Sequence, residues 1–236
     1  MITDNSIKDS PFKYDSKVWK YPLYFIFMMW FVYWIEYYFG YNFNTFGIFP
    51  RTYEGLKGVL LSPFIHGSAQ HLLNNSMPLF VLMAATIYFY RPVAAKVVLF
   101  GILISGFLTW LIGSEAYHIG ASGLIYVLAG FIFFSGVLRK SLRLVAISLA
   151  VAFWYGGMIW YVFPIVKNMS WEGHLSGLIT GILLAYRFRS TGLVKQDYQF
   201  TETEFDTYFD EEGNFNPPEI EDSNDETTID SHHPSS

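Results

Sequence analysis

The sequence contains no cysteine, which excludes a disulfide framework, a thiolate zinc site and a cysteine nucleophile. Charged residues are scarce as well: they make up 15% of the 236 residues, whereas a soluble domain carries about a quarter. No aspartate occurs between residues 16 and 196, and the H-E-x-x-H pattern of zinc proteases is missing. An aspartyl intramembrane protease, which needs two membrane aspartates, and a zinc protease of that type are therefore not expected.

The acidic residues are concentrated at the C-terminal end. Of the 20, 13 lie after Ser190, so the formal net charge of −5 describes that end and gives no sign of a nucleic-acid partner. Residues 190–236 are acidic and poor in aliphatic side chains, and we expect a disordered cytoplasmic tail there. Residues 1–20 are polar, show no signal-peptide pattern, and are assigned to a cytoplasmic N-terminus.

Between these ends the chain is strongly apolar: hydrophobic residues make up 52% of it and aromatic residues 20%. They gather in six stretches of roughly the 17–25 residues that a bilayer-spanning helix needs. The chain is therefore predicted to be an all-α membrane protein in which residues 21–189 form a six-transmembrane-helix bundle. The expected spans are Tyr21–Phe39, His71–Tyr90, Ala94–Ile112, Ile119–Leu138, Leu142–Phe163 and Trp171–Phe188.

Lysine and arginine are distributed asymmetrically between the connections of these spans. If the N-terminus is cytoplasmic, eleven of those within residues 1–189 fall inside, and Arg51, Lys57 and Lys167 fall outside. This bias predicts that both termini are cytoplasmic. The lack of transit-peptide character favours a bacterial-type cytoplasmic (inner) membrane. The first outside loop, residues 40–70, is long and partly apolar, which is typical of loops with a function or with structure of their own.

Three of the six spans begin at the outside and carry polar groups in their first turns. At 1.5 Å per residue, these groups lie within about 5–10 Å of the same surface. Ionisable residues in a span are costly and indicate function, so we expect one convergent polar site near the outer face. The residues are His71 and Asn75 on the second span, Ser122 and Tyr126 on the fourth, and His174, Gly177 and Gly181 on the sixth.

The missing carboxylates limit the chemistry of such a site. The four glutamates of residues 21–189 are interpreted as interfacial or loop residues, which leaves a dyad of Ser122 with His174 as its base. His71, Asn75 and the Ser122 backbone N–H are then placed to donate to a developing oxyanion.

Close approach of the glycine-bearing sixth helix would bring His174 near Ser122, and the Tyr126 ring would pack on the imidazole.

Each element also has a plainer explanation. The run Gly120-Ala-Ser-Gly123 can be a small-residue helix contact, and Leu124 stands where the elbow of soluble hydrolases has its last glycine. The two glycines of the last span can serve packing alone. His66 and His118 are interpreted as loop or interfacial residues outside the dyad. The combination of polar groups at matched depth is what favours catalysis.

The same residues resemble the motifs of the rhomboid family of intramembrane serine proteases. His71-Leu-Leu-Asn-Asn75 resembles the family's H-x-x-x-N on its second helix. Gly120-Ala-Ser-Gly-Leu-Ile-Tyr126 is similar to the G-x-S-G-x-x-Y that starts its fourth. His174, followed by Gly177 and Gly181, is similar to the histidine followed by G-x-x-x-G on its sixth helix. His66 also matches a histidine often found five residues before the first motif. The resemblance covers roughly residues 20–190.

The resemblance implies a bundle that cleaves transmembrane-anchored proteins near the outer face through an acyl-enzyme intermediate. No metal or organic cofactor is implied, and the expected partners are transmembrane substrates and the lipid bilayer, with no nucleic acid. The implied roles are Ser122 as nucleophile, His174 as general base and acid, His71, Asn75 and the Ser122 amide as oxyanion hole, Gly120 as room for the carbonyl, and Tyr126 as a ring stacked on His174.

The first outside loop departs from the family pattern. Several members carry a Trp-Arg pair there, whereas this chain has Phe49-Pro50-Arg51-Thr52, so no role is assigned to Arg51. Two other functions remain open: a non-catalytic rhomboid-like adaptor that binds transmembrane segments, and a small transporter. The outer-end clustering of the polar groups weighs against the transporter.

Overall fold

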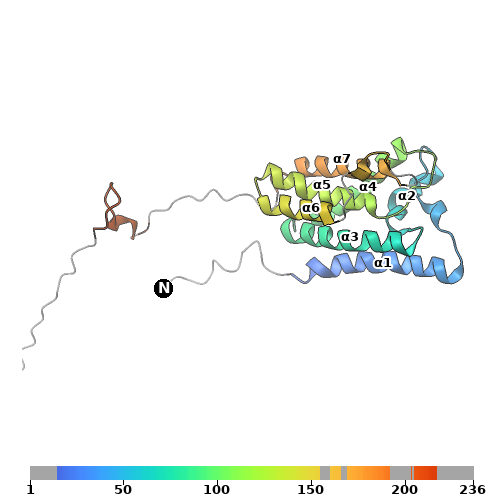
Figure 1. Ribbon diagram of the computed structural model, residues 1–236, viewed down its shortest axis with the longest axis horizontal. Coiled ribbons are helices and arrows are strands. Elements are labelled where there is room, and N and C mark those ends of the chain that lie inside the picture. The colour runs from blue at the N-terminus through green and yellow to red at the C-terminus, as the bar shows by residue number, and fades with distance from the viewer. Residues whose placement is uncertain (1–14, 155–159, 166–168, 192–202, 204, 217–236) are drawn as a thin grey trace, which may run out of the picture. The chain divides into compact units, whose positions relative to one another are not determined.

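The computed structural model describes residues 15–154, 160–165, 169–191, 203 and 205–216. Contacts divide the chain into two units, Met1–Lys195 and Gln196–Ser236. The described residues of the first unit form helices and no β-strand (Figure 1). Its six long helices are α1 (Lys17–Phe39), α3 (Ala69–Phe89), α4 (Ala94–Ile112), α5 (Ser122–Leu138), α6 (Leu142–Trp154) and α7 (Trp171–Arg187).

Each expected span corresponds to one of these helices, but some boundaries differ. α1 begins at Lys17, four residues before the predicted span. α5 begins at Ser122 rather than Ile119, because Gly120 has a φ of 104°, which no right-handed helix accommodates. Trp160–Val162 form the 3-10 helix η4, so the prediction of a continuous α-helix to Phe163 was wrong at its end. Residues 155–159, also in that predicted span, and Lys167 lie outside the described residues.

Two helices, α3 and α4, are long and apolar enough by themselves to cross a membrane. α5 and the stretch Leu144–Phe153 of α6 are apolar but shorter than a full span. The six-span topology therefore stays a prediction, whereas the helical architecture is as expected.

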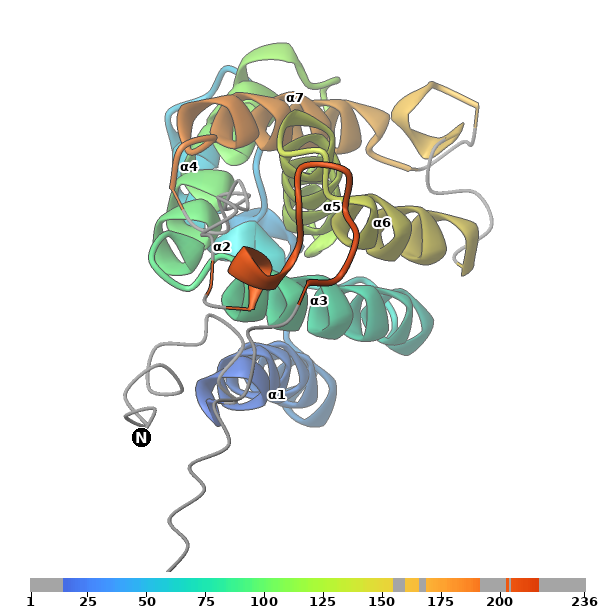
Figure 2. The same cartoon turned by 90° about the vertical axis from the view of Figure 1, so that its left-hand side faces the viewer.

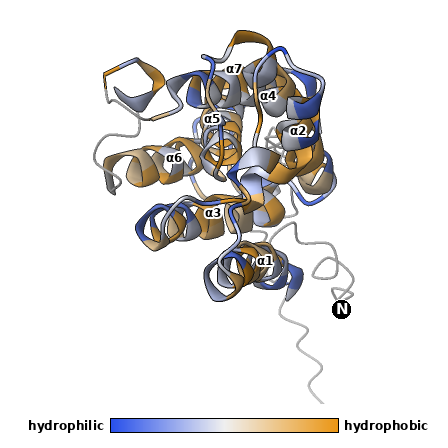
Figure 3. Ribbon diagram, turned by 90° about the vertical axis from the view of Figure 1, so that its right-hand side faces the viewer, coloured by the Kyte–Doolittle hydropathy of each residue, from blue (hydrophilic) through white to orange (hydrophobic). Residues whose placement is uncertain are grey.

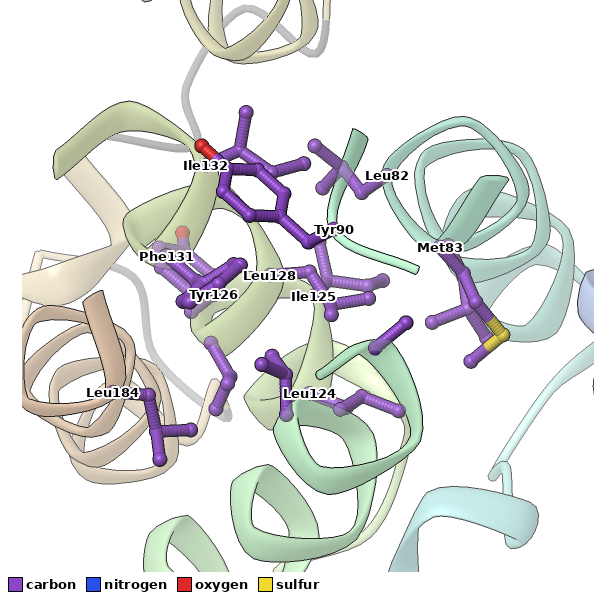
Figure 4. Packing of buried hydrophobic residues seen from close by; sticks show 14 of the residues in the cluster. Leu82, Met83, Tyr90, Leu124, Ile125, Tyr126, Leu128, Phe131, Ile132 and Leu184 are labelled. Atoms are coloured by element: carbon purple, nitrogen blue, oxygen red, sulfur yellow. The ribbon is translucent and has the colours of Figure 1, made fainter. Parts of the chain in front are cut away.

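α5 lies among the other helices, and α3, α4, α6 and α7 pack against it (Figure 2). It is apolar on all its faces, as expected for a buried helix, and ten of its 17 residues are buried. Figure 4 shows its side chains between Leu82 and Met83 of α3 and Leu184 of α7. The Phe131 ring meets Tyr90 edge to face, with centroids 4.8 Å apart. This packing fixes the helix that begins at Ser122.

α1 lies at the edge of the unit, against α3. Of its 23 residues only Pro22 and Met29 are buried, and many of its aromatic side chains are exposed. Trp30 donates its indole N–H to Ser76 Oγ at 3.1 Å. Much of the helical ribbon has the colour of hydrophobic residues (Figure 3). Among the described residues, many large hydrophobic side chains of these helices are exposed. An apolar surface of this extent suits contact with lipid.

The first connection is folded rather than extended. It contains η1 (Asn44–Phe46), η2 (Glu54–Lys57), α2 (Gly58–Leu61) and η3 (Ser62–Phe64), and α2 packs against α4. Arg51 donates from Nη1 to the Gly113 carbonyl at 2.8 Å, beyond the last turn of α4. The Trp110 indole N–H donates to the Thr52 carbonyl, also at 2.8 Å. Arg51 therefore has a structural role here, which is to fasten this connection to the end of α4.

The second unit is described at residues 203 and 205–216. These include the 3-10 helix η5 (Asp206–Tyr208) and an isolated bridge between Phe209 and Phe215. Asp210 Oδ1 accepts the backbone N–H of Asn214 at 2.8 Å, which closes the turn between the bridged residues. Local side-chain hydrogen bonds thus organise a turn within 205–216. The disorder of the tail over residues 190–236 stays a prediction.

Candidate active site

The first turns of α3, α5 and α7 lie at one end of the first unit, on the right in Figure 1. They border a cavity of about 1310 Å³. Ser122 and His71 are half-buried there, whereas Asn75 and His174 are 6% and 5% exposed. Five of the residues predicted from the sequence line this cavity: His71, Asn75, Ser122, Tyr126 and His174.

Ser122 is the first residue of α5, and the backbone before it is held on two sides. The Gly120 N–H donates to the Ser62 carbonyl at 2.9 Å, and the Ala121 N–H donates to His66 Nε2 at 3.4 Å. The first N–H groups of a helix have no partner within it, and the helix dipole makes this end attractive to negative charge. The N–H of Ser122 is therefore suited to stabilise an anion in the cavity.

The His174 ring is held in one orientation by two contacts. Its Nδ1 lies 2.8 Å from the Tyr161 carbonyl, and because a carbonyl only accepts, Nδ1 carries the proton. Nε2 of the neutral ring is then unprotonated and can act as a base. Tyr126 stacks on the imidazole, with centroids 4.4 Å apart and planes 18° apart. No hydrogen bond joins the described residues Ser122 and His174, and such catalytic hydrogen bonds are often long before substrate binds.

Glycines let α7 approach α5 closely. A Cβ on Gly177 would lie 2.3 Å from the Gly123 carbonyl oxygen, and one on Gly181 would lie 2.5 Å from that of Val127. Gly177 lies one turn after His174, and a Cβ there would also lie 2.8 Å from the Cβ of Tyr126, which lines the cavity. Gly181 lies deeper and contributes packing alone.

His66 has a role that the sequence interpretation missed. It is 1% exposed, and its Nε2 lies 3.0 Å from Asn75 Nδ2. Since the Ala121 N–H donates to the same Nε2, that nitrogen must be the acceptor, which turns the Asn75 NH₂ group toward it. Burial, with a smaller effect of neighbouring His71, lowers the pKa of His66 to about 3 and keeps the ring neutral. His66 therefore orients Asn75. The signal for this role in the sequence was the position of His66 five residues before His71.

Gly120 leaves open a space that faces two donors. A Cβ there would lie 2.8 Å from His71 Nε2 and 3.3 Å from Asn75 Nδ2. An oxygen atom at such distances would accept hydrogen bonds from both. The φ of 104° also favours glycine at this position.

Two residues lie elsewhere than the sequence suggested. Glu172, interpreted as interfacial, is 3% exposed in the first turn of α7 and accepts the Ser114 N–H at 3.0 Å. His118, also interpreted as a loop or interfacial residue, is 6% exposed and contacts Ser170. Among the described residues, no group of three or more His, Asp or Glu side chains is arranged to hold a metal ion.

Comparison with known proteins identifies the family. A sequence model of the Rhomboid domain matches residues 54–191, which is more than half of the chain. This chain belongs to the rhomboid family. It is accordingly a multi-pass membrane protein with a helical rhomboid domain.

The similar curated proteins are mycobacterial and uncharacterized. Those of Mycobacterium tuberculosis and Mycobacterium bovis are 35% identical over 151 residues, covering 59% of this chain and 62% of theirs. That of Mycobacterium leprae is 35% identical over 145 residues, covering 56% of this chain and 55% of its own. The matched region thus spans about three fifths of the length of these relatives or less.

Proposed function

We propose that this rhomboid protein is an intramembrane serine endopeptidase in which Ser122 is the nucleophile and His174 the general base. The observation that carries the proposal is the orientation of His174. Its Nδ1 donates to the Tyr161 carbonyl, and its Nε2 is left for Ser122, which lines the same cavity. Stacking on Tyr126 holds the ring against rotation.

In the acylation step, Ser122 Oγ attacks the carbonyl carbon of the scissile peptide bond while His174 Nε2 takes the hydroxyl proton. The tetrahedral oxyanion collapses, the C–N bond breaks, and His174 gives the proton to the leaving amine. Water then attacks the ester as His174 removes its proton, and that proton returns to Ser122 Oγ. The carboxylic acid product leaves, and both residues regain their starting state.

The oxyanion would lie in the space in front of Gly120. His71 Nε2 and Asn75 Nδ2 both face that space, and the Ser122 N–H is the third donor. One N–H of the Asn75 amide is used by His66, so the other remains for the oxyanion. Each donor of this kind contributes about 10²–10³ in kcat.

The proposed substrates are transmembrane-anchored proteins cleaved near the outer face. The support is the position of these residues in the first two turns of their helices, close to one end rather than at mid-length. They are His71, Asn75, Ser122 and His174. We place both termini in the cytoplasm and the protein in a bacterial-type cytoplasmic membrane, on the positive-inside bias of the sequence. Substrate would enter from the bilayer between helices and water from the outside.

Hydroxyl groups within the helices speak against a permeation path. Ser105, Thr109 and Thr180 each donate to the carbonyl four residues earlier in their own helix. Their polarity is therefore satisfied locally. A non-catalytic adaptor, in contrast, would have the same cavity. Only a measurement of cleavage distinguishes it from a peptidase.

The test is cleavage of a model transmembrane substrate by the full chain in proteoliposomes. Ser122→Ala and His174→Ala should each lower kcat by at least about 10³-fold. Ser135→Ala is the matched control, since Ser135 is a buried serine at the other end of α5. It should keep kcat within a factor of about 2, because Ser135 does not line the cavity. A wild type that binds the substrate without cutting it would refute the peptidase and support the adaptor.

A further inference from the structure

The segment Gly113–Gly120 connects α4 to α5 and ends two residues before Ser122. Its His118 is 6% exposed. His118 Nδ1 lies 2.5 Å from Ser170 Oγ, and Nε2 lies 3.1 Å from the Ser114 carbonyl. Because the carbonyl only accepts, Nε2 carries the proton in the neutral ring, and the Ser170 hydroxyl donates to Nδ1. A histidine outside the proposed dyad therefore joins this segment to Ser170.

Ser170 is the N-cap of α7, the helix that carries His174. Its Oγ accepts the Gly173 N–H at 3.2 Å, and its carbonyl accepts the His174 N–H at 3.2 Å. A displacement of Ser170 would therefore be passed to His174, one helical turn further along.

A second bond joins the same two parts of the chain. Glu172, in the first turn of α7, accepts the Ser114 N–H through Oε1 at 3.0 Å. With the bonds of His118 to Ser114 and to Ser170, and that of Ser170 to Gly173, it forms a chain of four hydrogen bonds between the segment and α7. His118, Glu172 and Gly173 are buried, Ser170 is half-buried and Ser114 is exposed. The bonds made by the buried groups are therefore hard to replace with water.

The backbone of His118 is fixed independently. Its N–H donates to the Ile48 carbonyl at 2.8 Å, and the Ile48 N–H donates to the His118 carbonyl at 3.0 Å. The space for the ring is provided by Gly113, whose Cβ would lie 2.7 Å from Nε2. The backbone of His118 is thus fixed, and its ring can hold the start of α7 in place.

We propose that His118 is a positioning residue that sets the separation of Ser122 and His174 by tying Gly113–Gly120 to the N-cap of α7. This inference rests on the proposed peptidase function. The glycine contact of Gly177 with Gly123 fixes α7 against α5 on one side of the site. The His118–Ser170 bond supplies a second point of attachment, so α7 cannot pivot about the first.

The experiment compares His118→Phe, which keeps the ring volume but has no ring nitrogen, with Thr86→Val. Thr86 is also buried and also loses one hydrogen bond, but it lies far along α3 from the cavity. In proteoliposomes, His118→Phe should lower kcat at least about ten-fold with KM within a factor of about 2, as expected for misplaced catalytic groups. Thr86→Val should change neither constant.

Two Ser170 variants keep the inference testable even if His118→Phe does not fold. Ser170→Gly removes the hydroxyl but costs the helix little stability, because glycine is itself a favourable N-cap residue. It should lower kcat as His118→Phe does. Ser170→Thr restores a hydroxyl and should restore kcat to within about three-fold of wild type. In the double variant of His118→Phe and Ser170→Gly, kcat should fall no further than in the worse single variant.

Equal kcat for His118→Phe and Thr86→Val, or multiplicative effects in the double variant, would overturn the inference. So would an effect confined to KM. These results leave the peptidase proposal intact, because wild type still cleaves and Ser122→Ala still does not. Absence of cleavage by wild type overturns the peptidase proposal and this inference with it.

Discussion

Substitution of Gly120 by alanine places a methyl group in the space proposed for the oxyanion. The new Cβ would lie 2.7 Å from His71 Cε1, 2.8 Å from His71 Nε2 and 3.3 Å from Asn75 Nδ2. Real Cβ atoms essentially never approach heavy atoms closer than 3.0 Å. Either the His71 ring moves or the 120–122 backbone does, and both displace donors from the oxyanion.

The magnitude has two parts. A side chain at the φ of 104° costs at least about 1–2 kcal/mol of stability, whatever surrounds it. Loss of one or more oxyanion donors lowers kcat by about 10²–10³. The first part acts on the thermal midpoint and the second on turnover, so the two can be measured separately.

Gly40 is the matched control for the backbone part. Its φ is 68°, and a Cβ there would meet nothing within 4 Å. Gly40→Ala should therefore lower the thermal midpoint of the detergent-solubilised protein while kcat stays within a factor of about 2. Gly120→Ala should lower the midpoint by a similar amount or more and kcat by at least about 10²-fold. Equal kcat values for the two variants would refute the placement of the oxyanion in front of Gly120.

Three further outcomes are expected. Gly177→Ala should lower both kcat and the thermal midpoint more than Gly101→Ala, because its Cβ would meet the Gly123 carbonyl at 2.3 Å, whereas that of Gly101 would meet only side-chain carbons. His66 should make the fold acid-sensitive: its pKa falls from 6.5 to about 3, so stability is complete above pH 6.5 and is lost as pH drops below it. The loss is at most about 1.4 kcal/mol per pH unit, and His66→Gln should flatten the pH dependence of the thermal midpoint. Tyr126→Leu should lower kcat by about 2- to 12-fold, which corresponds to the loss of a stacked ring pair.

Each of these outcomes has a contrary result. A Gly177→Ala protein as active and stable as Gly101→Ala would mean that α7 does not need its close approach to α5. If the thermal midpoint of His66→Gln falls with pH as steeply as that of wild type, the acid sensitivity comes from another group. Wild-type turnover in Tyr126→Leu would show that Tyr161 alone orients His174.

The helical architecture was predictable because the apolar runs are as long as membrane-spanning helices. A loop or a strand of a soluble protein does not need an apolar run of that length. The end of the fifth predicted helix was not, since Trp160–Val162 is as apolar as a helix and only the structure shows its 3-10 form. The turn at residues 205–216 escaped prediction for another reason. The acidic composition favours disorder, while one side chain, that of Asp210, organises the turn.

The residues of the site could be listed from the sequence because each lies in the first two turns of a helix with a recognisable spacing. What the sequence does not carry are the bonds that orient them. The partner of His174 is a backbone carbonyl, that of Tyr161, and any residue type would supply it. The partners of Asn75 and Ser170 are His66 and His118, which sequence separation alone does not pair with them.

The central claim, that Ser122 is a nucleophile activated by His174, is tested most directly by a fluorophosphonate probe on the full chain in membranes. After proteolysis and mass spectrometry, we expect a single phosphonylated peptide that carries the adduct on Ser122. Labelling should be absent in Ser122→Ala and lower by at least about 10³-fold in His174→Ala. An adduct of equal yield in Ser122→Ala, or none in wild type, would contradict the account.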